Sequence, residues 1–287
     1  MAEARIAIIG GSGLYEMEGL SDVTSVRVET PFGDPSDALV LGTLEDVPVA
    51  FLPRHGVGHR INPAELPSRA NIYALKSLGV ERIITVTACG SLKEGIAPQD
   101  IVIPDQIIHR TAGRPNTFFD RGIVAHVAFD EPFCPDLSAW LREAGDEVGA
   151  EVHLGGTFLV IEGPQFSTKA ESAVHRRWGT DIVGMTAVPE AKLAREAEIC
   201  YAALANVTDY DVWHEDVEPV TQEMVALNVQ KNVAASKAIL RAAIPRIAET
   251  RPCVCATALE GAIATDPALI PKKRREELAL LLDRYLS

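Results

Sequence analysis

Three apolar runs in this chain each end in a short turn that carries glycines, hydroxyls or carboxylates. The runs are residues 5–9, 82–86 and 199–207, and the turns that follow them are Gly-Gly-Ser-Gly, Thr-Ala-Cys-Gly-Ser and Thr-Asp-Tyr-Asp. Short runs that are apolar throughout are typical of strands buried in a parallel sheet. Ligands bind beyond the carboxyl ends of such strands in open α/β sheets. We therefore expect these turns to lie along one ligand-binding edge.

The rest of the chain alternates strand patterns with helix patterns. Strands are expected at residues 23–29, 38–44, 47–53, 101–104, 152–161 and 181–183, and helices at 68–78, 137–148, 168–178, 190–197, 220–243 and 271–286. Residues 106–135 are predicted to be a long loop, which in a compact domain usually serves a function or is covered by a partner. The alternation indicates an α/β fold. Because no linker divides the chain, we expect one domain over residues 1–287, with 251–287 as a C-terminal tail and helix.

The chain is acidic, with a net charge of −13 at pH 7. That charge argues against nucleic acid or an anionic membrane surface as a partner. The 47% of hydrophobic residues can bury a sizeable core. No apolar run approaches the roughly 20 residues that a membrane helix needs. The first residues show no secretory pattern, so a cytoplasmic location is expected.

Five cysteines occur, at positions Cys89, Cys134, Cys200, Cys253 and Cys255. The Cys-Val-Cys motif at 253–255 fits no zinc pattern by itself, and no second cysteine pair or histidine pair accompanies it in the sequence. No metal site is therefore predicted. Free buried thiols are expected in a cytoplasmic chain. A disulfide between Cys253 and Cys255, or between Cys134 and Cys200, is the alternative.

Asp209 and Asp211 follow the run at 199–207. If that run is a strand, the period of two places both carboxylates on one side, just beyond the carboxyl end. Two carboxylates this close and partly out of water raise the pKa of at least one, and a neutral carboxylic acid can donate a proton. The pair therefore suggests acid chemistry on a basic ring nitrogen. The alternative is a solvated turn, where aspartate is common.

A basic cluster, Arg-His-Gly-Val-Gly-His-Arg, spans residues 54–60. Arg54 offers a bidentate fork to a phosphate, and His55 adds a second donor. Ser12 supplies a hydroxyl in the first glycine turn, where backbone amides can approach an anion closely. The alternative is a solvated loop, or one paired with acidic residues. Glu16 occupies a position where a dinucleotide-binding loop needs glycine, which disfavours a Rossmann dehydrogenase.

Six motifs, in their order and spacing, resemble the trimeric purine nucleoside phosphorylase superfamily. They are Gly-Gly-Ser-Gly-Leu, Arg-His-Gly, Thr-Ala-Cys-Gly-Ser, Glu-Gly-Pro-Gln-Phe-Ser, Gly-Met-Thr-Ala-Val-Pro-Glu and Thr-Asp-Tyr-Asp. Within that superfamily the chain is most similar to the 5′-methylthioadenosine phosphorylase family, over nearly its whole length. The resemblance implies a single α/β domain around a mixed, partly barrel-like sheet flanked by helices. It also implies a homotrimer.

The resemblance further implies a reaction. Inorganic phosphate would cleave 5′-methylthioadenosine to adenine and 5-methylthioribose 1-phosphate, a pentosyltransferase step of purine and methionine salvage, with adenosine as a second candidate substrate. Phosphate is a co-substrate, and neither a metal nor an organic cofactor is implied. A 6-oxopurine nucleoside phosphorylase, acting on inosine, guanosine or methylthioinosine, is the alternative, because glycine before Met185 is frequent in that branch. A non-catalytic module that binds nucleosides without cleaving them is a third hypothesis.

Residue roles follow from the same resemblance. The phosphate site is implied to contain Ser12, Arg54, His55, Ala88 and Thr186. The nucleoside is implied to contact Thr87, Phe166, Met185, Gln222 and Val225, the last two beside the 5′ substituent. Asp209 would face purine N7 and Asp211 the 6-amino group. His126, and with less support Leu259, would reach the active site of a neighbouring subunit. For Phe166, packing in the core is the alternative.

Overall fold

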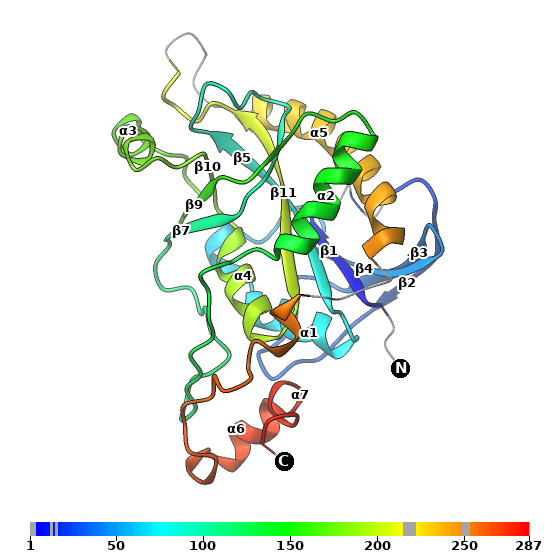
Figure 1. Ribbon diagram of the computed structural model, residues 1–287, viewed down its shortest axis with the longest axis vertical. Coiled ribbons are helices and arrows are strands. Elements are labelled where there is room, and N and C mark those ends of the chain that lie inside the picture. Colours follow the sequence, from blue (N-terminus) through cyan, green and yellow to red (C-terminus); the bar gives the residue numbers. More distant parts are fainter. Residues whose placement is uncertain (1–3, 12–13, 15–16, 215–221, 248–252, 287) are drawn as a thin grey trace.

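The computed structural model of the chain describes residues 4–11, 14, 17–214, 222–247 and 253–286, with side chains between 222 and 230 described only at position 228. These residues form one mixed sheet of eleven strands with helices against both faces (Figure 1). The predicted single-domain α/β fold is thereby confirmed. None of the described helices is long and apolar enough to cross a membrane.

The strands are β1 (Ile6–Gly10), β2 (Leu20–Val26), β3 (Leu39–Leu44), β4 (Val47–Pro53), β5 (Arg82–Ser91), β6 (Ile101–Ile103), β7 (Gln106–Arg110), β8 (Val152–Leu154), β9 (Thr157–Ile161), β10 (Ile182–Gly184) and β11 (Cys200–Asp209). The helices are α1 (Ser68–Ser77), α2 (Pro135–Glu147), α3 (Lys169–Arg177), α4 (Ala187–Glu196), α5 (Gln222–Ile247), α6 (Lys272–Glu277) and α7 (Ala279–Leu282). Short 3-10 turns lie at Pro63–Glu65, Val254–Thr257 and Pro267–Leu269.

Strand β5 is the centre of the sheet. One of its edges pairs in parallel with β11 along nearly its whole length. The other edge pairs in parallel with β1 up to Thr85, and then in antiparallel orientation with β10 from Gly90. The sheet continues from β1 through β4 to β3 and β2, and from β10 through β9 to β7. Between these two branches, residues 86–89 of β5 have one edge without a strand partner among the described residues.

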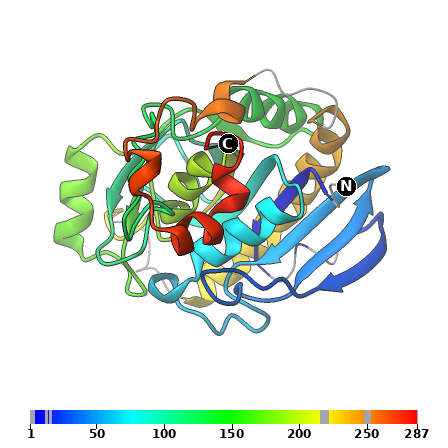
Figure 2. The same cartoon turned by 90° about the horizontal axis from the view of Figure 1, so that it is seen from below.

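Both faces of the central strands are covered, which explains why these strands are apolar throughout. Successive residues alternate between two cores: Ile8 and Leu204 belong to the core under α2 and α5, whereas Ile9 and Ala203 belong to the core under α1 and α4. Figure 2 shows α1, α6 and α7 in front of the sheet, with α3 at one side and the β2–β3–β4 ribbon at the other. Burial on both faces makes these strands the rigid part of the fold.

Four predicted elements differ from the structure. The turn expected at residues 87–91 is the second half of β5, which runs to Ser91 because its pairing with β11 continues to Gly90. The strand expected at 152–161 is two strands, because Gly155 and Gly156 have positive φ angles of 90° and 112°; β8 pairs with β6, whereas β9 pairs with β7 and β10. The segment 106–135 is not loop throughout, since it opens with β7. The C-terminal helix is interrupted at Leu278, whose φ and ψ are −105° and 12°.

The described part of the C-terminal tail packs back on the sheet through Glu198, which lies just before β11. Its carboxylate accepts hydrogen bonds from the amide of Leu259, at 3.1 Å, and from the Tyr285 hydroxyl. It also pairs with Arg284, Nη1 to Oε2, at 3.6 Å. The Tyr73 hydroxyl donates to the carbonyl of Glu277. The tail is therefore part of the domain.

We expect Gly184→Ala to destabilise the fold. A β-carbon at position 184 would lie 2.8 Å and 2.9 Å from two ring carbons of Phe158, a fully buried residue of β9. Overpacking of this kind costs about 1–3 kcal/mol. Gly95 is the matched control, because its β-carbon would meet nothing within 4 Å. Urea denaturation of both variants checks the prediction; equal stability would contradict it.

Candidate active site

The candidate site lies where the sheet divides, along residues 86–89 of β5. The Val86 carbonyl there accepts a hydrogen bond from Arg54, and Ala88 is exposed although its neighbours in the strand are buried. Thr208, on β11, donates to the carbonyl of Cys89 at 3.2 Å. Because β5 is unpaired on one edge at these residues, side chains and ligands can approach its backbone there.

The two aspartates meet through a turn. Asp209 is the last residue of β11 and follows a bulge after Val207. Asp211 has a left-handed φ of 51°, and its amide donates to Asp209 Oδ1 at 2.8 Å. Thr208 donates to Asp209 Oδ2 at 2.7 Å. The carboxylates do lie together, but an aspartate turn brings them there instead of the strand alternation that the sequence predicted.

Burial raises the pKa of Asp209 to about 6, against hydrogen bonds from Thr208 and the Asp211 amide that lower it. The charge of Asp211 adds a smaller rise. Burial also raises the pKa of Asp211. The upward shift expected from the sequence is thus present, although removal from water causes it more than like-charge repulsion does. Gly90 permits this packing, because a β-carbon there would lie 2.8 Å from Asp209 Oδ1.

Several buried polar atoms gather at Asp211. Its Oδ2, the hydroxyls of Ser167 and Ser172, and His175 Nδ1 have no well-formed hydrogen bond within the described residues. The two serines and His175 nevertheless lie close enough to lower the pKa of Asp211, against the effect of burial. Buried polar atoms without partners are rare in native proteins. The group is therefore suited to a polar ligand. No periodic or motif signal in the sequence pointed to Ser172 or His175, which both lie on α3.

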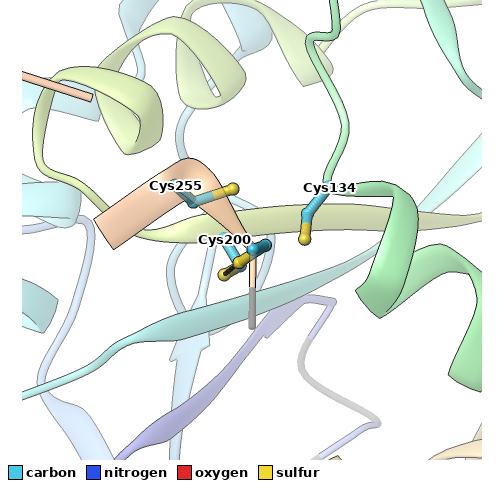
Figure 3. A group of neighbouring side chains, drawn as sticks. Cys134, Cys200 and Cys255 are labelled. Atoms are coloured by element: carbon cyan, nitrogen blue, oxygen red, sulfur yellow. Dashed lines mark hydrogen bonds between the residues drawn. The ribbon is translucent and has the colours of Figure 1, made fainter. Parts of the chain in front are cut away.

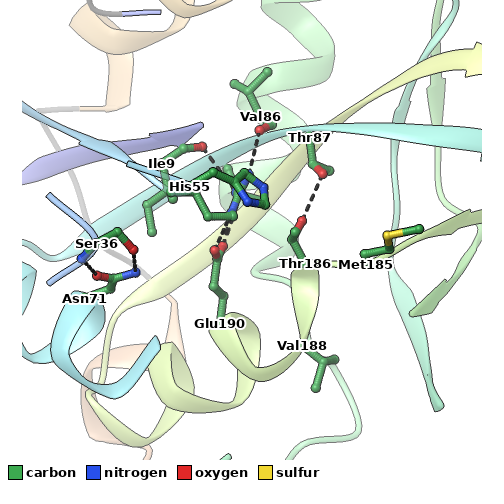
Figure 4. A network of polar contacts seen from close by, with 12 residues as sticks. Ile9, Ser36, His55, Asn71, Val86, Thr87, Met185, Thr186, Val188 and Glu190 are labelled. Carbon is green, nitrogen blue, oxygen red and sulfur yellow. Dashed lines mark hydrogen bonds and ion pairs between the residues drawn. The ribbon is translucent and has the colours of Figure 1, made fainter. Parts of the chain in front are cut away.

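Arg54 follows β4 and is almost completely buried, with 2% of its surface exposed. It donates from Nε to Glu190 Oε1 at 2.5 Å and from Nη1 to the Val86 carbonyl at 3.2 Å; Nη2 contacts Glu190 and Thr85 (Figure 4). A guanidinium has five N–H groups. One N–H of Nη1 is therefore left without a partner among the described residues. Glu190, which the sequence analysis did not assign, holds the arginine in place.

His55 donates from Nδ1, because that atom lies 2.8 Å from the Ile61 carbonyl, which can only accept. Burial and the charge of Arg54 lower the pKa of His55 to about 4. The ring is therefore neutral at pH 7, and its Nε2 carries a lone pair. The sequence predicted His55 to be a donor to phosphate; in this tautomer Nε2 accepts a hydrogen bond instead.

Two hydroxyls, those of Thr87 and Thr186, point toward each other in Figure 4. Thr87 Oγ1 on β5 and Thr186 Oγ1, which directly precedes α4, are 3.0 Å apart. Both residues are buried. The Thr186 hydroxyl makes no capping bond to α4, so its oxygen does not accept from the amides that begin this helix. Arg54 bonds to Val86 on β5, two residues before Ala88, and Thr186 contacts Thr87 between them. The resemblance implied Arg54, Ala88 and Thr186 for the phosphate site and Thr87 for the nucleoside.

Met185 and Phe166 lie on two segments that Arg114 connects. Arg114 donates to the Met185 carbonyl at 2.7 Å and to Glu162 Oε1 at 2.9 Å. A side chain at Gly163 would collide with the Met185 sulfur. Phe166 is 47% exposed, so the alternative of a core phenylalanine is wrong. Arg114 had no predicted role, and only the three-dimensional contacts identify it as a connector.

The remaining predicted residues divide into three groups. His126 is exposed, and its amide donates to the Ala262 carbonyl, where the long loop after β7 meets the C-terminal tail. Leu259 is 1% exposed and belongs to the chain's own core, so the prediction that it reaches a neighbouring subunit is wrong. Ser12 and the side chains of Gln222 and Val225 lie outside the described residues.

We expect Asp209→Asn to stabilise the protein at high pH only. Because the pKa rises from 3.8 to about 6, folding favours the protonated carboxyl. The contribution of Asp209 to the stability of the wild type is therefore full below about pH 4, and about 3 kcal/mol of it is lost as the pH rises through 6. Asparagine is uncharged and has nearly the shape of the protonated carboxyl group. The Thr208 hydroxyl can accept a hydrogen bond from the side-chain amide of the asparagine while it donates to the Cys89 carbonyl.

Thermal unfolding at about pH 4 and about pH 8 checks this prediction. The melting temperature of the variant should exceed that of the wild type at the higher pH, and the two should converge at the lower pH. A temperature difference that is the same at both pH values would show that Asp209 does not titrate with a raised pKa.

The comparisons with known proteins agree with this geometry. Residues 5–245 match the model of the Phosphorylase superfamily. The chain is 55% identical over 285 residues to the S-methyl-5′-thioadenosine phosphorylase of Geobacter sulfurreducens, covering 99% of this chain and 100% of that one. It is 57% identical to the protein of the same name from Chloroflexus aurantiacus, with 100% of each chain covered.

Solved structures give the same result. A methylthioadenosine phosphorylase from an antarctic soil metagenomic library has a TM-score of 0.93 at 48% identity, covering 98% of this chain and 100% of that one. The methylthioadenosine phosphorylase of Schistosoma mansoni in complex with adenine has a TM-score of 0.82 at 37% identity, covering 98% of each. The chain belongs to the Phosphorylase superfamily, in the family of S-methyl-5′-thioadenosine phosphorylases.

Proposed function

We propose that the protein cleaves S-methyl-5′-thioadenosine with inorganic phosphate, releasing adenine and 5-methylthioribose 1-phosphate. The observation that carries the proposal is the buried Asp209–Asp211 pair, which lies against Gly90 at one end of the opened stretch of β5, whereas Arg54 bonds to Val86 at the other end. Val86 contacts Arg54 and Gly90 contacts Asp209. These two residues of β5 are four positions apart, a distance of about 13 Å along a strand. That spacing leaves room for a pentose between a phosphate at one group and a purine at the other.

The proposed acid is Asp209. The C1′–N9 bond breaks as a phosphate oxygen bonds to C1′, and the sugar passes through an oxocarbenium-like state. Adenine would leave as an anion unless N7 gains a proton, and a neutral carboxylic acid can supply it. With a pKa of about 6, Asp209 retains a protonated fraction near neutral pH that an ordinary aspartate does not have.

The proposed phosphate site combines the remaining N–H of Arg54, the hydroxyls of Thr87 and Thr186, and the backbone at Ala88. Anionic phosphate beneath the sugar would also stabilise the developing positive charge electrostatically. Neutral His55 contributes an acceptor, so it suits the P–OH group of a phosphate that still carries a proton. Ser12 stays in this proposal on the family resemblance alone, and neither a metal nor an organic cofactor has a role in the reaction.

The 6-aminopurine preference rests on Asp211. Its Oδ2 is a buried acceptor that Ser167 and Ser172 approach without a well-formed hydrogen bond among the described residues, and an exocyclic amino group is a donor. A 6-oxo group would place two acceptors against each other, and unsatisfied buried polar groups cost about 1–3 kcal/mol each. This argument favours methylthioadenosine and adenosine over inosine. The apolar pocket for the 5′-methylthio group, with Gln222 and Val225, is carried over from the resemblance.

We also propose a cytoplasmic homotrimer, on the family resemblance. The exposure of His126 in its own chain supports a role for this residue at a neighbouring active site. In Figure 1 the segment after β7 runs from the sheet toward α6 and α7, away from the carboxyl ends of β5 and β11. A residue on this segment is therefore better placed to contact another subunit than the aspartates of its own chain. Sedimentation equilibrium on the preparation used for kinetics measures the oligomeric state.

A phosphate-dependent turnover panel with methylthioadenosine, adenosine and inosine tests the function. We expect adenine release from methylthioadenosine only when phosphate is present, with inosine the poorest substrate.

Asp209→Asn should lower kcat by about 10²- to 10⁴-fold, the usual contribution of a general acid. Asp211→Asn, which offers a donor to the ring, should shift preference toward inosine. Preference of the wild type for inosine would favour the 6-oxopurine alternative, and binding without cleavage would favour a binding module.

Arg54→Lys should weaken phosphate binding selectively. Lysine keeps the positive charge beside Glu190. Its single ammonium group lacks the planar set of N–H donors with which the guanidinium can contact Glu190 and an anion at the same time. Loss of a charged hydrogen bond predicts a rise of about 10- to 100-fold in the KM for phosphate, with little change in the KM for nucleoside. Arg60→Lys is the matched control, because Arg60 lies on the same loop but is exposed and bonds to Ser36 and Asp37. Equal effects of the two changes would remove Arg54 from the anion site.

A further inference from the structure

Four of the five cysteines meet at one point of the fold. Cys134, Cys200, Cys253 and Cys255 have sulfur atoms that all lie within 4.8 Å of one another, and three of the four residues are buried. Figure 3 shows the sulfurs converging from three segments: the start of α2, the start of β11 and the C-terminal tail. The sequence analysis found no partner pair for the Cys-Val-Cys motif, because the two residues that complete the group are far away in the sequence.

The spacing of the sulfurs is that of a four-thiolate metal site. In tetrahedral coordination with Zn–S bonds of about 2.3 Å, neighbouring sulfurs are about 3.8 Å apart. The Sγ atoms of Cys200 and Cys253 are 3.1 Å apart, and the largest separation in the group is within 4.8 Å. Every pair is therefore within about 1 Å of tetrahedral spacing. A disulfide would need about 2.05 Å, and all four residues are free thiols.

The surroundings of the sulfurs suit thiolates only when a cation binds them. Cys134 precedes the first turn of α2, a thirteen-residue helix whose positive dipole end lies at this residue. Three of the cysteines are part of an apolar core that includes Leu137 and Ile244. Unpaired thiolates are costly in such a core, whereas a divalent cation bound by all four offsets their charge.

We propose that these four cysteines bind one zinc ion in tetrahedral coordination. Four thiolate ligands and a closed, buried site are the features of structural zinc. The sulfurs are too close together for a multinuclear iron–sulfur cluster but fit a single ion. Cys200 begins β11 and Asp209 ends it, so the zinc site and the aspartates are separated by about 30 Å of strand. The zinc is therefore structural and takes no part in phosphorolysis.

The consequence of the site is a second attachment of the C-terminal tail. Cys253 and Cys255 belong to the tail, and Cys134 and Cys200 belong to the sheet and its covering helix. The zinc would act together with the Glu198 contacts to hold the tail on the domain. Closing a loop of this kind restricts the unfolded chain, and metal binding contributes directly to the free energy of folding.

Elemental analysis tests the proposal. The full-length wild type, purified without a metal-affinity tag or chelator, should contain close to one zinc per chain. When the wild type is denatured in chelator without reductant, all five of its thiols should react with a thiol reagent. Cobalt added to the reduced, metal-free protein should give the charge-transfer and d–d absorption of tetrahedral thiolate coordination. A chain that takes up no zinc even when reduced, that contains iron in its place, or that releases a single thiol because it holds two disulfides would overturn the proposal.

Variants locate the site. Cys253→Ser changes the least buried of the four ligands, and we expect its zinc content to fall at least about tenfold. Chelator should lower the melting temperature of the wild type but not of this variant. Cys89→Ala, at the fifth cysteine, is the matched control and should keep its zinc. Retention of zinc and of the cobalt spectrum in Cys253→Ser would overturn the assignment, and the wild-type measurements decide the question even if a variant does not fold.

Discussion

The parallel pairing of β5 with β11 is the constraint on which the rest of the structure depends. It places Asp209 opposite Gly90, where the absence of a β-carbon gives the carboxylate room. It also leaves the other edge of β5 to be shared between β1 and β10, and the interval between them is the opening at which the site forms. Because both faces of these strands are covered, the aspartates are out of water, and their pKa values rise for that reason.

Charge is distributed unevenly between the two halves of the site. An acidic chain must hold its anion-binding groups in place against many competing carboxylates, and Glu190 does this for Arg54 by forming a buried, nearly bidentate ion pair. A buried ion pair of this kind adds little to the free energy of folding, and its main effect here is to hold the guanidinium in position. At the other half, no cation among the described residues forms an ion pair with Asp209, which keeps it able to hold a proton. The same strand thus supports an anion site and an acid site about 13 Å apart.

Much of the site could be predicted because its residues lie in short, local motifs. The Arg-His-Gly segment follows β4, the Thr-Ala-Cys-Gly-Ser segment is the carboxyl-terminal half of β5, and Thr-Asp-Tyr-Asp spans the end of β11. The carboxyl ends of parallel strands meet at one edge wherever those strands lie. Residues that act through distant contacts gave no such signal. Arg114 bridges two loops, His175 approaches Asp211 from α3, and the cysteines of the proposed zinc site come from three separate segments. Leu259 was misassigned because sequence does not show which way a side chain in a tail faces.

The sequence by itself determined the α/β class, the positions of the buried strands and the identity of the polar groups at their ends, because hydrophobic periodicity and turn chemistry are local properties. Only the tertiary structure decided how these groups act. The division of β5 between two partners, the left-handed turn at Asp211, the tautomer of His55 and the convergence of four thiols all depend on strand register and on contacts between distant residues. Such contacts form only when the chain packs, and no local pattern records them.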